Sequence, residues 1–184
     1  MSIEKVAVKC YSSHNQSSVT ALIPVFHRWI QEDVVGGIPL DVADYRHVPN
    51  GPGVLLIGHD ADWGVDEHEG PHGLIYNHKR NLQGETDADR IAFCVQQLLH
   101  AVKVLHSEDS LDIRFSSERL RLVFNDRLQQ PNDDSTFEAL RPAIETALSQ
   151  VFGEQVEAMI ERDTTDPRWR LTVHVALSPA PSFA

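Results

Sequence analysis

Between residues 57 and 78 the sequence reads IGHDADWGVDEHEGPHGLIYNH, which holds four histidines and five carboxylates. Imidazole and carboxylate groups are the donors that zinc, iron, nickel and manganese accept from proteins. We therefore expect a divalent metal, if one binds, at His59, His68 and His72. A metal-binding pair is normally held rigidly, as in HExxH on a helix or HxH on a strand, whereas these histidines lie on a segment broken by glycines, so local structure does not fix their positions. The alternative is an acidic, solvated hairpin without a metal.

A second polar group stands at the end of an expected strand, in the sequence DVADYRH. Alternation along the strand places Tyr45 and His47 on one face. We expect this strand to pair antiparallel with the apolar run VLLIG, and we expect that pairing to bring His47 close to His59 and Asp62. A histidine beside a carboxylate can serve as a general base with an orienting partner. The alternative is that these side chains only solvate a turn.

His27, in the helical sequence FHRWIQ, lies at the margin of an apolar stripe, where a histidine is ordinarily a half-buried core residue. Tryptophans near helix margins or strand ends, such as Trp63, line ligand grooves or subunit contacts, although packing alone explains each one. Together these patterns predict a small-molecule or metal site at strand ends near residues 47–62. Its expected ligand-binding residues are His27, Asp44, His47, His59 and Asp62.

Hydrophobic periodicity predicts the elements that must position these groups. Helices are expected at residues 17–33, 84–109 and 135–153. Strands are expected at residues 5–11, 38–45, 54–58, 155–162 and 168–177. The stretch from 59 onward is expected to form one or two strands ending at GLIYN (73–77), and LDIRF (111–115) and LRLVFN (120–125) are expected to form a hairpin around SSER (116–119).

Residues at the expected helix ends support these assignments. Thr86 or Asp87 can cap the second helix, whose first turn is acidic. The third helix opens with the capping-box sequence Ser135-x-x-Glu138 and closes at Gly153. Both helices are therefore expected to have sharply defined ends.

A shift of 118 residues superimposes segment 17–59 on segment 135–177 without a gap and aligns Pro24 with Pro142. Only five of the 43 positions are identical. The two segments are similar in the spacing of their apolar residues and in the order of their expected helices and strands. Each proline lies about two turns into its helix, where it would remove a backbone hydrogen bond at a cost of ~3 kcal/mol. We expect the two helices either to begin after their apparent caps or to be kinked.

The elements predict an α+β fold, with an antiparallel-rich sheet and about three helices in two related β-α-β-β halves. Residues 5–115 follow the order of a ferredoxin-like sandwich. In the alternative, two paired modules face each other, an order that resembles the metal-dependent vicinal-oxygen-chelate proteins with their paired βαβββ modules. No sequence motif accompanies this resemblance, so the metal ligands of that family are not assigned to residues of this chain. We expect lobes at 1–110 and 111–177 and a mobile tail at 178–184, in one compact unit.

Composition and charge disfavour several classes of partner. The chain of 184 residues has a net charge of −11, and its 16 basic residues are dispersed, which disfavours nucleic acid and anionic membrane surfaces. No apolar run approaches the ~20 residues of a membrane span, and the N-terminus lacks the apolar segment of a signal peptide. The two cysteines form no CxxC pair. We expect a cytoplasmic protein.

Three functions remain open. The first is a small-molecule or metal-binding module, and the second is a hydrolase or lyase that uses a histidine–carboxylate pair at the same place. The third is a non-enzymatic interaction protein, a homodimer whose contact is formed by a sheet edge or by Phe93 and Val104 on the second helix.

Overall fold

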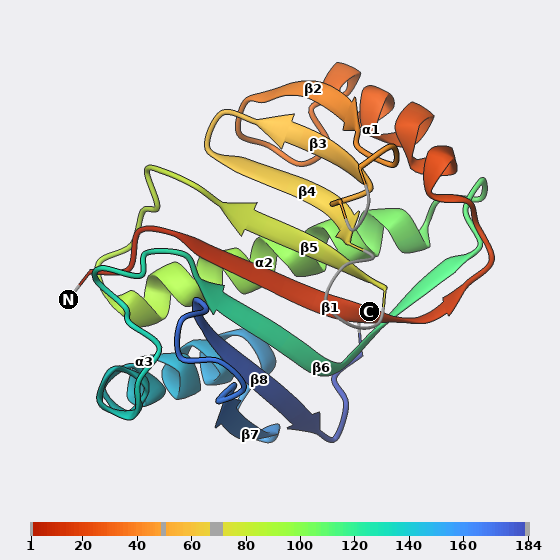
Figure 1. The fold of residues 1–184 in the computed structure, drawn as a ribbon. Helices are drawn as coiled ribbons and strands as arrows, with labels where there is room; N and C mark the ends of the chain where they lie inside the picture. Colours follow the sequence, from red (N-terminus) through yellow and green to blue (C-terminus); the bar gives the residue numbers. More distant parts are fainter. Residues whose placement is uncertain (1, 49–50, 67–71, 183–184) are drawn as a thin grey trace.

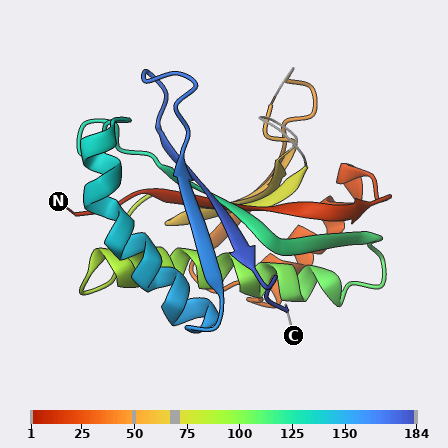
Figure 2. The same cartoon turned by 90° about the horizontal axis from the view of Figure 1, so that it is seen from below.

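A computed structural model of the chain describes residues 2–48, 51–66 and 72–182 (Figure 1). Within these residues eight strands form one sheet, and three α-helices lie against a single face of it (Figure 2). In chain order the elements are β1 (Val6–Asn15), the short 3-10 helix η1 (Val19–Ala21), α1 (Leu22–Gln31), β2 (Pro39–Asp44), β3 (Val54–Gly58), β4 (Ala61–Asp66), β5 (Gly73–His78), α2 (Asp87–His106), β6 (Ile113–Phe124), α3 (Asp134–Phe152), β7 (Glu157–Arg162) and β8 (Leu171–Ser178).

The strand order is β2-β3-β4-β5-β1-β6-β8-β7, and all neighbouring strands are antiparallel. The predicted α+β fold with an antiparallel sheet is confirmed. A ferredoxin-like sandwich would place two parallel strands side by side. The observed order instead has β1 and β6 at its centre and β2 and β7 at its two edges, which agrees with the paired alternative.

The two halves of the sheet differ by one insertion. In the C-terminal half β8 pairs directly with β6, whereas in the N-terminal half the hairpin β4–β5 separates β3 from β1. A shift of 118 residues carries β2 onto β7, so the edge strands occupy equivalent places. The hairpin β4–β5 and the following helix α2 have no counterpart in the C-terminal half. The predicted lobe boundary at residue 110 lies between α2 and β6, and both lobes contribute strands to the one sheet.

Helix α2 begins at a complete capping box. The hydroxyl of Thr86 accepts the backbone N–H of Asp89 at 3.1 Å, and the Asp89 carboxylate accepts the backbone N–H of Thr86 at 2.9 Å. Its predicted apolar stripe is buried against the sheet, and a second side of the helix packs on α3 (Figure 2). This fixed helix therefore provides a rigid wall beside β5.

Two of the predicted boundaries are wrong. The sequence SSER is not a hairpin turn, because β6 continues through it as one strand along β1. Cys10 pairs with Leu120 and Tyr11 with Ser116, so the intervening residues of β6 form a bulge. The bulge contains most of the polar sequence SSER. Helix α3 is capped by Asp133, which accepts the N–H of Thr136 at 2.7 Å, rather than by Ser135.

The two prolines are accommodated in different ways. Helix α1 begins at Leu22, so Pro24 lies in its first turn, where its missing N–H has no helical acceptor to lose. Helix α3 begins well before Pro142, which lies inside it. The repeated sequence pattern therefore produces two different helix starts.

The core lies between the sheet and the helices. Both cysteines are buried in it, and burial raises the pKa of Cys10 to about 12, so neither thiol is poised to react. The predicted mobile tail contacts β6, where the hydroxyl of Ser117 donates to the carbonyl of Pro181. None of the helices in the described part of the chain is both long and apolar enough to cross a bilayer.

Candidate functional site

The polar group at the end of β2 lies far from His59. Asp44 is paired with Val54 at the start of β3, whereas His59 follows the end of β3 and donates its backbone N–H to the Ile38 carbonyl at 2.8 Å. The predicted convergence of His47 on His59 is therefore wrong. Antiparallel pairing through a turn brings the end of the first strand to the start of the second, which separates the two imidazoles by the length of β3.

Asp44 and His47 are exposed and make local contacts. The Arg46 guanidinium donates to the Asp44 carboxylate, with Nε 2.9 Å from Oδ1, and this hydrogen bond is the main reason why the pKa of Asp44 falls to about 2. The His47 ring stacks on Tyr45 with centroids 6.4 Å apart. These contacts are those expected of a solvated turn.

The two described histidines of the predicted metal set lie at opposite ends of the β4–β5 hairpin. His59 precedes Ala61 at one end, and His72 precedes Gly73 at the other. A hairpin of this length spans roughly 15–20 Å at ~3.4 Å per residue, so the two cannot share an ion. His68 lies outside the described residues. Among the residues that the structure describes, no group of three histidine, cysteine or acidic side chains could hold a metal.

The remaining predicted residues are also dispersed. Asp62 follows the alternation of β4 away from the buried Trp63 and binds the Lys79 ammonium at 2.7 Å on the face without helices. His27 is exposed on α1. Only His59 of the five predicted residues lines the pocket described next.

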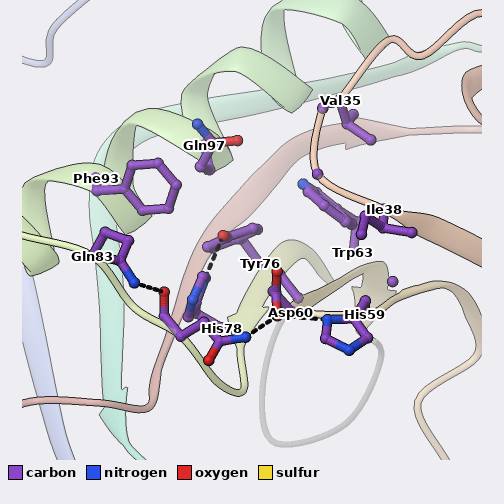
Figure 3. Close-up of a pocket in the computed structure, with 15 residues that line it drawn as sticks. Val35, Ile38, His59, Asp60, Trp63, Tyr76, His78, Gln83, Phe93 and Gln97 are labelled. Atoms are coloured by element: carbon purple, nitrogen blue, oxygen red, sulfur yellow. Dashed lines mark hydrogen bonds and ion pairs between the residues drawn. The ribbon is translucent and has the colours of Figure 1, made fainter.

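A pocket lies between α2, the β4–β5 hairpin and the segment that joins α1 to β2 (Figure 3). Its volume is about 220 Å³, and at ~30 Å³ per water it has room for about seven waters or one small ring. Two glycines with positive φ, Gly36 (67°) and Gly37 (72°), turn the joining segment along one side. The inserted hairpin and helix thus supply six of the fifteen lining residues, and the connecting segments supply most of the others.

The pocket wall contains a series of four packed aromatic rings. Trp63 on β4 is the direct cross-strand partner of Tyr76 on β5, and their ring centroids are 5.2 Å apart at 60°. His78, two residues further along β5, faces the same side and lies 5.9 Å from the Tyr76 ring. The ring of Phe93 on α2 meets His78 edge-on at 5.9 Å and 85°. Trp63 is 4% exposed and Phe93 37% exposed, so Phe93 stands at the mouth.

Several polar groups of the wall, Nε2 of His78 among them, lack hydrogen bonds within the described part of the chain. The Trp63 indole N–H is buried without an acceptor, a situation that costs roughly 1–3 kcal/mol for a buried donor. The Gln97 amide on α2, which is partly exposed to solvent, also makes no hydrogen bond to a described residue. Figure 3 shows the Gln97 amide and the nitrogen-bearing edge of Trp63 turned toward each other across the pocket.

Tyr76 and His78 form a buried pair, with the phenol oxygen 2.7 Å from Nδ1. Burial raises the pKa of Tyr76, so its O–H stays protonated and can donate to Nδ1 when the neutral imidazole carries its proton on Nε2. Nε2 makes no hydrogen bond to a described residue, although the Arg80 carbonyl lies near the ring. Burial lowers the pKa of His78 against the opposing effects of Arg80 and of the Asp60 charge, so the ring is neutral at pH 7.

The rim of the pocket is acidic. The Asp60 carboxylate accepts hydrogen bonds from the Asn81 side chain and from His59 Nδ1, each at 2.8 Å, and these bonds lower its pKa. Figure 3 shows the His59 ring with its second nitrogen turned away from the pocket. A histidine–carboxylate pair is present here, with Asp60 in the place where Asp62 was expected.

Comparisons with known protein families, with curated proteins and with solved structures find no match. The site is therefore defined by the geometry of this chain alone.

Sequence reasoning did not single out Tyr76, His78 and Gln97, and it weighed Trp63 and Phe93 only as packing or contact residues. A signal exists in the alternation of ADWGVD and GLIYNH, which puts Trp63, Tyr76 and His78 on the same faces as buried valine and leucine. Their pairing register depends on the intervening turn, which the pattern does not fix. The two residues of the expected homodimer contact differ in exposure. Phe93 is exposed at the pocket mouth, whereas Val104 is partly buried against the core.

Proposed function

We propose that the protein is a small-molecule-binding module whose site is the pocket between α2 and the β4–β5 hairpin. The proposal is carried by the buried, unpartnered Trp63 N–H in a wall whose surface is mainly apolar. Ligand pockets have this composition, with apolar walls and a few polar groups that fix orientation. Their usual volume is ~300–1,000 Å³, so a pocket of about 220 Å³ is suited to a small ligand.

The origin of the pocket in the fold supports the same function. In the C-terminal half of the sheet β8 pairs directly with β6. A half-sheet of this kind therefore forms without an inserted hairpin. The insertion nevertheless adds three aromatic side chains on one face and a capped helix opposite them. A cavity and an unpaired buried donor both reduce stability, and a bound ligand compensates for both.

The test is an NMR screen of one-ring fragments against the labelled protein. Fragments that bind in the pocket are expected to move the signals of Trp63, Tyr76 and Phe93. The variant Ala61→Leu places a larger side chain at the pocket wall and is expected to abolish this binding, while Ala43→Leu on β2, which does not line the pocket, serves as the matched control. If no fragment moves the pocket signals, the proposal is rejected.

A second candidate, a hydrolase or lyase, is favoured by the His59–Asp60 pair at the rim. A carboxylate that binds Nδ1 leaves the other imidazole nitrogen free for proton transfer. Because that nitrogen points away from the pocket (Figure 3), the ring must rotate before it can act on a bound molecule. Hydrolysis of p-nitrophenyl acetate that is unchanged in His59→Gln would reject this candidate.

A further inference from the structure

We infer that the pocket is specific for a neutral, planar, one-ring amide, either a cyclic lactam or an aromatic carboxamide. The inference rests on the proposed function, because it concerns the ligand of the same pocket. In this arrangement the ligand carbonyl accepts the Trp63 N–H, and the ligand N–H donates to the Gln97 side-chain oxygen.

The hydrogen-bonding groups of the pocket call for a ligand that both accepts and donates. Indole offers only a donor, and it is buried here without an acceptor. The partly exposed Gln97 amide offers both kinds of group, and neither bonds to a described residue. The other glutamine of the wall, Gln83, differs because its NH₂ already donates to the Asn81 carbonyl at 3.0 Å. A carbonyl with a neighbouring N–H satisfies Trp63 and Gln97 together.

The charges of the wall select a neutral ligand over an anion. No lysine or arginine is among the fifteen residues that line the pocket, whereas Asp60 is. The carboxylate of Asp60 is held ionised by its bonds from His59 and Asn81. The Lys79 ammonium, close by in sequence, is bound to Asp62 on the opposite face of the hairpin. A carboxylate ligand would therefore enter beside a like charge and without a cation.

The rings and the volume select a flat ligand of one ring. Trp63, Tyr76, His78 and Phe93 form a continuous series in which each ring meets the next at 47° to 85°. Aromatic faces and edges arranged in this way favour a planar guest between them. The volume of about 220 Å³ leaves room for one ring with a small substituent.

Access to the Trp63 N–H requires a small adjustment at the mouth. The nitrogen has almost no exposed area in this structure. Ile38 and Phe93, which are 57% and 37% exposed, line the same pocket. We expect rotation of these two side chains toward solvent, without movement of the sheet, to open the path to the indole.

Three probes of similar shape test the inference: benzamide, acetophenone and benzoate. Each is titrated into ¹⁵N-labelled protein while the three tryptophan indole signals are recorded. Benzamide is expected to move the Trp63 signal and to leave those of Trp29 and Trp169 in place. Acetophenone lacks the N–H, and loss of one neutral hydrogen bond predicts binding about three- to tenfold weaker. Benzoate is expected to bind at least roughly tenfold weaker, because of the adjacent negative charge.

Variants then assign the two hydrogen bonds. Gln97→Ala is expected to weaken benzamide about three- to tenfold and to leave acetophenone unchanged. Gln96→Ala is the matched control, since Gln96 is exposed on the same helix and does not line the pocket. Trp63→Phe keeps a ring and removes the N–H, so it is expected to weaken both carbonyl probes. If this buried substitution prevents folding, the Gln97 and Gln96 variants still decide.

The outcomes separate this inference from the proposed function. Weaker benzamide binding in Gln97→Ala alone, with benzoate the weakest probe, supports the amide. Benzoate that binds as tightly as benzamide, or a Gln97→Ala variant that binds benzamide normally, overturns the amide and leaves a small-molecule pocket. Failure of all three probes, together with failure of the wider fragment screen, overturns both.

Discussion

The phenol oxygen of Tyr76 lies 2.7 Å from Nδ1 of His78 and forms a hydrogen bond with it in the buried wall of the pocket. The two residues are separated by one residue on β5 and therefore face the same side of the sheet. This bond joins the phenol to the imidazole, which lies edge-on to Phe93.

We expect Tyr76→Phe to lower the free energy of unfolding by about 1–3 kcal/mol, because Nδ1 of His78 would remain buried without a hydrogen-bond partner. Urea denaturation followed by circular dichroism measures the change. Tyr45→Phe is the control, since Tyr45 is exposed and a surface substitution of this kind is expected to stay within ~0.5 kcal/mol. Equal effects of the two substitutions would contradict the assigned hydrogen bond.

We expect stability to decline as the pH falls below about 6.5, and His78 to contribute to this decline. Burial lowers the pKa of His78 in the folded protein below its ordinary value of 6.5, so the unfolded chain takes up the proton first. The contribution of neutral His78 to the free energy of unfolding is fully present above pH 6.5 and is lost as the pH falls through the pKa of His78 in the folded protein. His106, whose pKa is also lowered by burial, acts in the same direction.

The difference between the wild type and His78→Gln isolates the contribution of His78. The free energy of unfolding, measured between pH 8 and pH 5, is expected to fall less steeply in His78→Gln than in the wild type. His27→Gln, at an exposed position on α1, should keep the wild-type slope. A His78→Gln slope equal to that of the wild type would show that the ring is not buried in its neutral form.

The elements could be predicted from the sequence because their signals are local. The apolar run VLLIG corresponds to β3 residue for residue, and the Thr86 cap and the stripe of α2 follow from spacing alone. The turn at SSER could not be judged in this way. Whether such a polar run turns or bulges depends on its pairing with β1, which lies more than a hundred residues earlier in the chain.

The candidate site was harder to predict than the helices and strands, because most of its residues meet through contacts that are distant in sequence. His59 was found because its residue type and place after a strand are local features. Trp63, His78 and Gln97 meet only through the strand register and the packing of α2, and a buried donor without an acceptor has no signature in sequence. His47 and His59 do not meet because the antiparallel pairing brings the end of β2 to the start of β3, whereas His59 follows the end of β3.

Thr86→Ala is expected to destabilise the protein by about 1 kcal/mol through loss of the capping box of α2. Because α2 carries Phe93 and Gln97, fraying of its first turns is also expected to weaken the binding of pocket fragments. Thermal unfolding and the fragment titration together measure the two effects. Thr164→Ala in the exposed turn between β7 and β8 should change neither, and a silent Thr86→Ala would contradict the role of the cap.

The distance between His59 and His72 makes a prediction about metals. Since the two imidazoles lie at opposite ends of the β4–β5 hairpin, they cannot contribute to one coordination shell. We expect His59→Ala, His72→Ala and the double variant to show independent effects on zinc binding, so that the two changes in binding free energy add within ~0.5 kcal/mol. Zinc titration by calorimetry measures this additivity. If each single substitution removed the same zinc ion entirely, the two rings would have to approach each other, and the antiparallel register of the hairpin described above would be wrong.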